Sequence, residues 1–376
     1  MISINELKQR REKLEGIMSD MCLDAIVLNG NSAVGPIAYG CFRYFADHRT
    51  YYHQQAVIAR PSKDMAICIG SILHMDGVRN KGFEDIRLSP DILGSVIKVL
   101  SEQKVSRVGV PYDALPYDWE LTLKEKFPGI QLVDVTDEVF KLRNVHSDYE
   151  VECSKTSAKI ADAGYAAICE TARPGVHMSD VHAAMDYAMR KAGAEETFTL
   201  MSNGVFSYEH NTLTCIKAFT WPDDRVIQYG DNLGMEISPK YQGYWTQLVR
   251  TICVGEMNPD LQKAHDLQLE VMNYTVKLLK PGAKLGDVLK AMWQFTIDHG
   301  FIPKLPFGHI VGLDLDEGGR ASLESDLIIQ KNSTVVLHPT IVLGDMDYGI
   351  FWGDAFLVTD DGGVRLNECS TDLLAV

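Results

Sequence analysis

The sequence contains no long hydrophobic run and no closely paired cysteines, and its 36 Lys and Arg are outnumbered by 51 Asp and Glu. A membrane-spanning helix needs about 20 consecutive apolar residues, and no stretch approaches that length. Residues 1–20 carry charges throughout rather than the apolar centre of a secretory signal, so we expect no signal peptide. The eight cysteines are scattered without CxxC spacing, which is typical of reduced thiols and favours a cytoplasmic protein.

Positive charge is scarce, and the formal net charge is −15. Nucleic acids and anionic membranes are bound by clustered Lys and Arg, so we expect neither as a partner. The hydrophobic fraction of 46% is ordinary for a globular protein, and a chain of 376 residues is long enough for two domains.

Residues 1–148 alternate helical and strand-like patterns. Short apolar runs separated by turn residues are typical of buried strands, and they occur at 24–29, 55–59, 65–69 and 107–110. Helical periodicity is found at 4–20 and 92–103. The polar stretch 141–150 then precedes a long helical pattern. We therefore predict an α/β N-terminal domain at 1–148 and a second domain at 149–376.

The second domain contains an internal duplication. Residues 173–193 align with 280–300 without a gap, and each copy reads as a turn, an acidic residue, an amphipathic helix and a terminal glycine. The identical positions are Pro174, Gly175, Asp180, Val181, Ala184, Met185 and Gly193, matching Pro281, Gly282, Asp287, Val288, Ala291, Met292 and Gly300. The repeat predicts two similar α+β halves related by a pseudo-two-fold axis.

Each copy continues into a segment with a histidine and then into a pair of strands. The histidines are His210 and His309, and the strands carry Glu236 in the first copy and His338 in the second. Packing the halves face to face would place His210 opposite His309 and Glu236 opposite His338. A polar cluster at the axis is expected, because a buried imidazole or carboxylate in an apolar strand needs a partner.

Four stretches resemble a known family: residues 141–164, 280–288, 307–320 and 353–362. Together they are similar to the pita-bread domain of methionine aminopeptidase, aminopeptidase P, prolidase and creatinase. The resemblance covers essentially the whole chain, and it implies a creatinase-type N-terminal domain before the pita-bread domain. It also implies a homodimer in which the partner's N-terminal domain covers the active site. Arg49 and His53 lie in the corresponding loop and are predicted to bind substrate.

The metallopeptidases of this family hold two metal ions with two Asp, one His and two Glu. The resemblance places these ligands, in order, on Glu236, Gln247, His309, His338 and Gly353. Only His309 keeps its identity, and paired metals need bridging carboxylates to offset their mutual repulsion. We therefore expect no metal cofactor. The alternative is one Fe, Mn or Zn ion held by Glu236, His309 and His338.

Creatinase departs from the metal pattern in a similar way. Its catalytic His-Asn pair resembles His210-Asn211, and its carboxylate-binding Arg resembles Arg320. It retains Glu at the positions of His338 and Gly353, so the resemblance implies a less cationic substrate here.

These comparisons predict a metal-independent hydrolase, or a lyase, that cleaves a C–N bond in a small molecule carrying a carboxylate. A non-catalytic pita-bread protein that binds peptides is the third alternative. The predicted catalytic residues are His210, His309, His338 and Glu236, and the further predicted substrate-binding residues are Arg320, Gln247 and Asp354.

Overall fold

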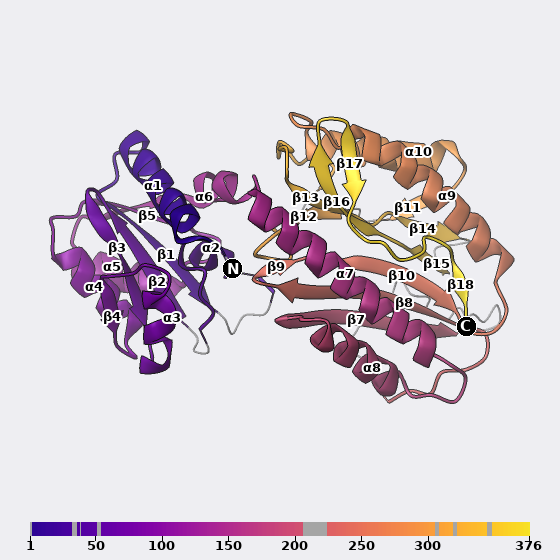
Figure 1. The fold of residues 1–376 in the computed structure, drawn as a ribbon. Helices are drawn as coiled ribbons and strands as arrows, with labels where there is room; N and C mark the ends of the chain where they lie inside the picture. The colour runs from indigo at the N-terminus through magenta and orange to yellow at the C-terminus, as the bar shows by residue number, and fades with distance from the viewer. Residues whose placement is uncertain are drawn as a thin grey trace. The chain divides into compact units, whose positions relative to one another are not determined.

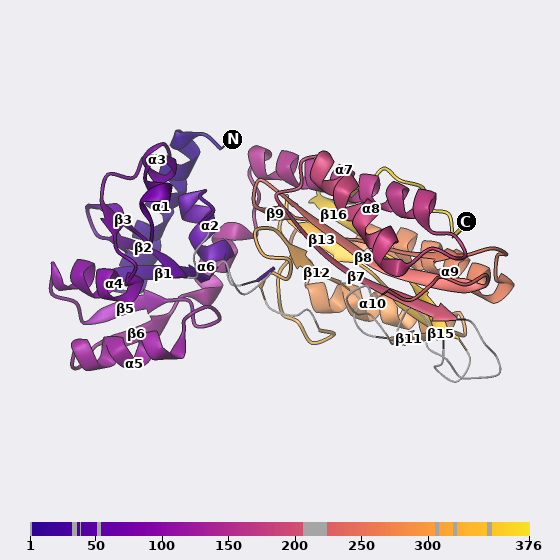
Figure 2. The same ribbon diagram turned by 90° about the horizontal axis from the view of Figure 1, so that it is seen from below.

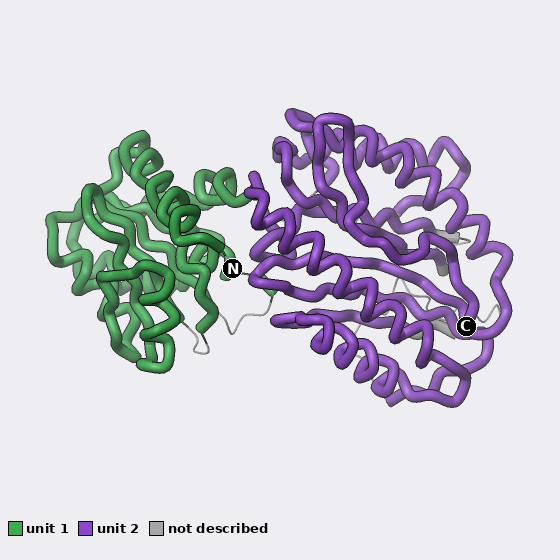
Figure 3. The backbone as a smooth tube through the Cα atoms, in the orientation of Figure 1, with its two compact units in different colours: residues 1–143 green, residues 144–376 purple. Residues whose placement is uncertain are grey.

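The computed structural model describes residues 2–31, 36–37, 39–50, 54–205, 224–304, 308–318, 322–343 and 348–376. They divide into two compact units, Met1–Arg143 and Asn144–Val376 (Figure 3). The division lies slightly before the predicted boundary at 148. Asn144 and His146 belong to the second unit because Ser333 Oγ donates to the Asn144 carbonyl at 2.8 Å and Thr334 Oγ1 lies 3.3 Å from His146 Nδ1. No helix in the described part of the chain is long and apolar enough to span a membrane.

The first unit contains a mixed six-stranded sheet in the order β4-β3-β2-β1-β5-β6 (Figure 1). Its strands are β1 Ala25–Asn31, β2 Gln54–Arg60, β3 Lys63–Ile69, β4 Ile86–Leu88, β5 Arg107–Val110 and β6 Gln131–Asp134. Helices α4 Ile92–Ser101 and α5 Tyr117–Lys126 cover one face of the sheet, and α1 Ile4–Asp20 and α2 Gly40–Ala46 pack on the other. The short α3 Met75–Arg79 and α6 Thr136–Arg143 complete the unit. The predicted α/β class is confirmed.

In the second unit the two predicted copies adopt the same local structure. Helices α8 Met178–Lys191 and α10 Leu285–Asp298 follow the longer helices α7 Asp148–Thr171 and α9 Pro259–Thr275. Gly175 and Gly282 both have positive φ, 92° and 89°, in the turn before the shorter helix. At the next equivalent positions, His177 forms an isolated bridge with Val226 and Lys284 forms one with Ile328. Because equivalent positions make equivalent contacts, the duplication is confirmed.

In the first copy β8 runs unbroken and only the adjoining strand is divided, at Thr246 and Gln247 between β9 and β10, whereas both corresponding strands of the second copy are divided (Figure 2). The first copy contributes β7 Glu196–Val205, β8 Asp231–Tyr241, β9 Tyr244–Trp245 and β10 Leu248–Cys253, joined by the C-terminal β18 Leu374–Ala375. The second copy forms two small sheets. One contains β11 Ile302–Lys304, β14 Thr340–Leu343 and β15 Tyr348–Phe351, and the other contains β12 Gly308–Val311, β13 Thr334–Leu337, β16 Asp354–Thr359 and β17 Gly362–Arg365.

The divisions fall at predicted site residues. His338 and Pro339 separate β13 from β14, and Trp352 and Gly353 separate β15 from β16. Gln268 of α9, whose side chain is fully buried, supports both points by donating to the carbonyl oxygens of Pro339 and Trp352. Two backbone carbonyls that leave regular strand pairing at these points are thus hydrogen-bonded to Gln268. The fold therefore accommodates the interruptions without leaving these buried carbonyls unsatisfied.

Candidate active site

The candidate site lies where the two copies meet along one pair of backbone hydrogen bonds. Val249 of β10 and Gly353 donate to and accept from each other, both at 2.9 Å. Glu236 of β8 is the register partner of Val249, and Gly353 lies against His338. Neighbouring strands are about 4.8 Å apart, so two such steps place Glu236 roughly 10 Å across the sheet from Gly353. The His338 segment lies on the far side of Gly353 in this row, and the predicted placement of Glu236 opposite His338 stays a prediction.

Glu236 has an unusual electrostatic environment. Its side chain is partly buried between β7 and β10, and no described residue forms an ion pair or hydrogen bond with its carboxylate. Burial penalises the charged form and raises the pKa of Glu236 to about 7. A carboxyl group with this pKa is a mixture of acid and base near neutral pH, as general acid–base catalysis requires.

Two imidazoles lie together on the second-copy side of the junction. The ring centres of His309 and His338 are 5.3 Å apart, and His338 also meets the edge of the Phe351 ring at 5.3 Å. His309 Nε2 lies 3.4 Å from Gln247 Oε1, and its Nδ1 lies 3.3 Å from the Ile310 carbonyl oxygen. Since both neighbours are oxygens, the neutral ring donates to one of them and the protonated ring donates to both. The structure thus brings together three of the predicted residues: Gln247, His309 and His338.

Gly353 leaves no room for a side chain. A Cβ built on this residue would lie 2.5 Å from the Leu337 carbonyl oxygen and 2.7 Å from Cα of His338. Both obstacles are backbone atoms, which cannot move aside as a flexible side chain would. Glycine at this position is therefore a steric requirement of the His338 segment.

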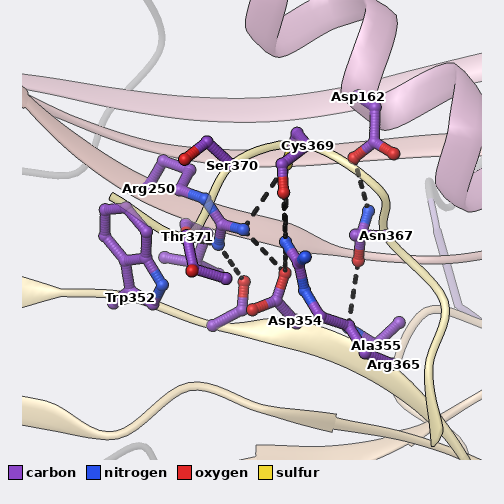
Figure 4. Close-up of polar contacts among 12 residues, drawn as sticks. Asp162, Arg250, Trp352, Asp354, Ala355, Arg365, Asn367, Cys369, Ser370 and Thr371 are labelled. Atoms are coloured by element: carbon purple, nitrogen blue, oxygen red, sulfur yellow. Dashed lines mark hydrogen bonds and ion pairs between the residues drawn. The ribbon is translucent and has the colours of Figure 1, made fainter. Parts of the chain in front are cut away.

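Asp354, for which a substrate-binding role stays a prediction, takes part in a buried ion-pair cluster. Its Oδ1 accepts from Arg250 Nη2 at 2.7 Å and forms an ion pair with Arg365 Nη2 at 2.9 Å (Figure 4). Burial lowers the pKa of Arg250, but the charge and hydrogen bond of Asp354, together with the nearby Cys369 and Tyr165, raise it by more, so the net shift is upward and the guanidinium stays charged. The structure assigns Asp354 to this buried ion-pair cluster, because its carboxylate is the counter-charge for two arginines.

Other predicted residues lie elsewhere. His210, Arg320 and His53 are outside the described residues. Arg49 is exposed in the first unit. In the neighbouring residue His48, Nε2 lies 3.1 Å from His74 Nδ1. Burial lowers the pKa of His48 to about 4, and the nearby His74 contributes a smaller part of this shift. The roles predicted for Arg49 and His53 stay predictions.

The chain matches two family descriptions over nearly its whole length. Residues 152–360 match "Metallopeptidase family M24", and residues 10–145 match "Creatinase/Prolidase N-terminal domain". The chain belongs to the M24 family. The predicted family resemblance is therefore confirmed.

Individual M24 proteins cover this chain almost end to end. The creatinase of a Bacillus species is 26% identical over 350 residues, covering 91% of this chain and 82% of the relative. The Xaa-Pro dipeptidase of Pyrococcus furiosus is 23% identical over 381 residues, covering 98% and 100%. The crystal structure of the X-Pro aminopeptidase of Thermotoga maritima superposes with a TM-score of 0.83 at 20% identity, covering 97% and 99%. The two-domain pita-bread fold is confirmed.

The residues present do not fit the paired metal ions that the M24 description implies. Of the five positions named above, only Glu236 offers a carboxylate, Gln247 offers an uncharged amide, and Gly353 has no space for a ligand. Two adjacent cations need bridging negative charge, which this donor set lacks. Among the described residues, moreover, no three His, Cys, Asp or Glu side chains are grouped so that they could hold a metal ion.

Two buried residues of this region were missed by the sequence interpretation. Arg250 is fully buried within the apolar strand β10, and Gln268 is fully buried on α9. The signal for Arg250 was available, since a charged residue in an apolar strand must have a buried counter-charge. Gln268 gave no such signal, because a single amide on an amphipathic helix is unremarkable until its acceptors are known.

Proposed function

We propose that this M24 protein hydrolyses a C–N bond in a small molecule that carries a carboxylate, using carboxyl and imidazole groups for proton transfer. The observation that carries the proposal is Glu236, a carboxyl group with a pKa of about 7 in the strand next to the bridge that leads to His338. Relatives named as dipeptidases cleave an amide, which is a C–N bond, and they support the same reaction class.

In the proposed reaction, a water molecule adds to the carbon of the scissile C–N bond. Ionised Glu236 accepts a proton from this water and, once protonated, returns a proton to the departing nitrogen. His309 and His338 donate hydrogen bonds to the substrate heteroatom on which negative charge develops. His210 is assigned a proton-transfer role from its resemblance to the creatinase His-Asn pair, and Arg320 is assigned to the substrate carboxylate, which an Arg binds through two parallel hydrogen bonds. An elimination would use the same groups without the water.

We further propose that catalysis does not use a pair of metal ions. The steric requirement at Gly353 and the single carboxylate at Glu236 support this. The second candidate is one Fe, Mn or Zn ion on Glu236, His309 and His338, which the M24 description supports and the spacing of these three described side chains does not. Elemental analysis of protein purified without chelators distinguishes the two, since a stoichiometric metal that is required for turnover would establish the second.

The test is a screen followed by substitution. The wild-type protein is incubated with a panel of carboxylate-bearing amides, Xaa-Pro dipeptides and guanidino acids, and C–N cleavage is followed by mass spectrometry. Replacing Glu236 by Gln or His210 by Ala should lower turnover about a hundredfold or more, the scale of general acid–base catalysis, with little change in thermal melting. Turnover retained by both variants would contradict the proposal. Tight peptide binding without any turnover would favour the non-catalytic alternative.

We also propose the homodimer implied by the family resemblance, with the partner's N-terminal domain covering the site. Light scattering of the full chain measures this directly. A monomer that retains full turnover would contradict it.

A further inference from the structure

Arg250 binds both residues of the bridge that joins the two copies. Its side chain has 0% exposure, and its Nη1 donates to the carbonyl oxygens of Val249 and Gly353, each at 2.8 Å. Each of these carbonyls already accepts the backbone N–H of the other residue at 2.9 Å. One guanidinium nitrogen therefore ties the two strands together at the point where they meet.

The guanidinium is itself fixed on two further sides. Its Nη2 donates to Asp354 Oδ1 at 2.7 Å, and its central carbon lies 4.2 Å from the centre of the Trp352 ring (Figure 4). Planar guanidinium geometry allows these contacts at once, which a lysine ammonium cannot reproduce.

Arg365 provides a natural comparison within the same cluster. It pairs with Asp354 at 2.9 Å and donates to the Cys369 carbonyl at 2.9 Å, but among the described residues it does not contact the carbonyl oxygens of the bridge. Arg250 and Arg365 thus share a counter-charge and differ in whether they hold the junction.

We propose that Arg250 is a positioning residue of the candidate active site, because it holds the bridge between the strand next to Glu236 and the segment of His338. Fixing this bridge fixes the spacing between the carboxyl group and the imidazoles. The inference rests on the function proposed for that site. Asp354 acts through Arg250 by keeping the guanidinium in place.

The experiment compares Arg250→Lys with Arg365→Lys. In Arg250→Lys the bridge loosens, and kcat for the substrate found in the screen should fall about a hundredfold with KM nearly unchanged, since a misplacement of about 1 Å has effects of this size. Water entering beside Glu236 should also lower its carboxyl pKa from about 7 toward the ordinary value of about 4.3. Nuclear magnetic resonance of 13C-labelled glutamate measures that change without any substrate. Arg365→Lys should leave both quantities as in the wild type.

A second variant covers the case in which Arg250→Lys does not fold. The double substitution Arg250→Met with Asp354→Asn removes both charges of this buried pair, which is often tolerated. Arg365 then loses its ion pair but keeps its hydrogen bond to the Cys369 carbonyl, and its side chain is 26% exposed to water. The double variant should fold and still show the loss of kcat and the lowered pKa of Glu236.

Three results would overturn the inference. The first is a folded Arg250 variant that keeps the wild-type kcat and the wild-type pKa of Glu236. The second is the same loss in Arg365→Lys. The third is failure of both Arg250 variants to fold while Arg365→Lys folds. This result would show that Arg250 has a structural role only. Retained turnover in Glu236→Gln would instead contradict the proposed function, whatever the Arg250 variants show.

Discussion

Each copy has a proline just after its predicted site residue, and the two prolines have different surroundings. In the first copy Pro239 lies inside β8, which continues through it, and in the second copy Pro339 lies at the division between β13 and β14. Each proline carbonyl accepts from the long helix of its own copy: Ser157 of α7 donates to Pro239 at 2.9 Å, and Gln268 of α9 donates to Pro339. Each of these side chains also contacts the break in the adjoining strand: Gln268 donates to the Trp352 carbonyl at 3.3 Å, and Ser157 Oγ accepts from Thr246 Oγ1 at 3.0 Å.

The comparison shows that proline alone does not divide the strand. What differs is the adjoining strand, where Gly353 approaches the backbone of Leu337 and His338 too closely for any side chain. The first copy thus keeps a regular strand that carries one buried carboxyl group, Glu236. The second gives up regular pairing and places His338 at the break. The carboxyl group of Glu236 and the imidazole of His338, which we propose act together, therefore come from different copies.

The largest effect is expected for Gly353→Ala. The added methyl group meets backbone atoms, so the free energy of unfolding should fall by about 3 kcal/mol, near the top of the range for overpacking. Urea unfolding measures the change. Gly16→Ala is the control, because Gly16 lies on helix α1 with nothing within 4 Å of the new atom, and there alanine should stabilise by about 0.5–1 kcal/mol. Equal effects of the two substitutions would show that the junction is not tight.

A matched pair of substitutions tests the two helix-to-proline contacts. Gln268→Ala leaves two buried carbonyls without this donor and should cost about 2–3 kcal/mol, whereas Ser157→Ala leaves one carbonyl without its donor and the Thr246 hydroxyl without this acceptor and should cost about 1–2 kcal/mol. Both are measured by chemical unfolding. If Ser157→Ala lowered the free energy of unfolding as much as Gln268→Ala, the Gln268 contacts at the divided strands would not be stronger than the Ser157 contacts of the first copy.

The smallest expected effect is a pH dependence of stability. Burial raises the pKa of Glu236 to about 7, so the folded state favours the protonated form, and the stability this provides is present at low pH and lost as pH rises through about 7. Between about pH 5 and pH 8 the wild type should lose roughly 1–3 kcal/mol more stability than Glu236→Gln, at about 1.36 kcal/mol per pKa unit and with allowance for partial exposure. Chemical unfolding of both proteins at the two pH values measures this. The same difference in unfolding free energy between the wild type and Glu236→Gln at both pH values would contradict the prediction.

Much of the fold could be predicted from the sequence, because it depends on local signals. The α/β first unit followed from short apolar runs, and the duplication followed from Gly175 and Gly282, whose positive φ angles the repeated turn requires. The site was predicted only in part. His309, His338 and Glu236 stood out as polar residues in apolar strands, but the ion pairs of Asp354 could not be predicted, because Arg250 and Arg365 are brought to it only by strand pairing.

A titration of the Glu236 carboxyl group in the wild-type protein tests the central claim most directly. Nuclear magnetic resonance of 13C-labelled glutamate, with Glu236→Gln used to assign the signal, gives its pKa without a substrate. The account predicts about 7. A value near about 4.3, the ordinary value for glutamate, would contradict it, because the junction would then hold a plain carboxylate that cannot donate a proton near neutral pH.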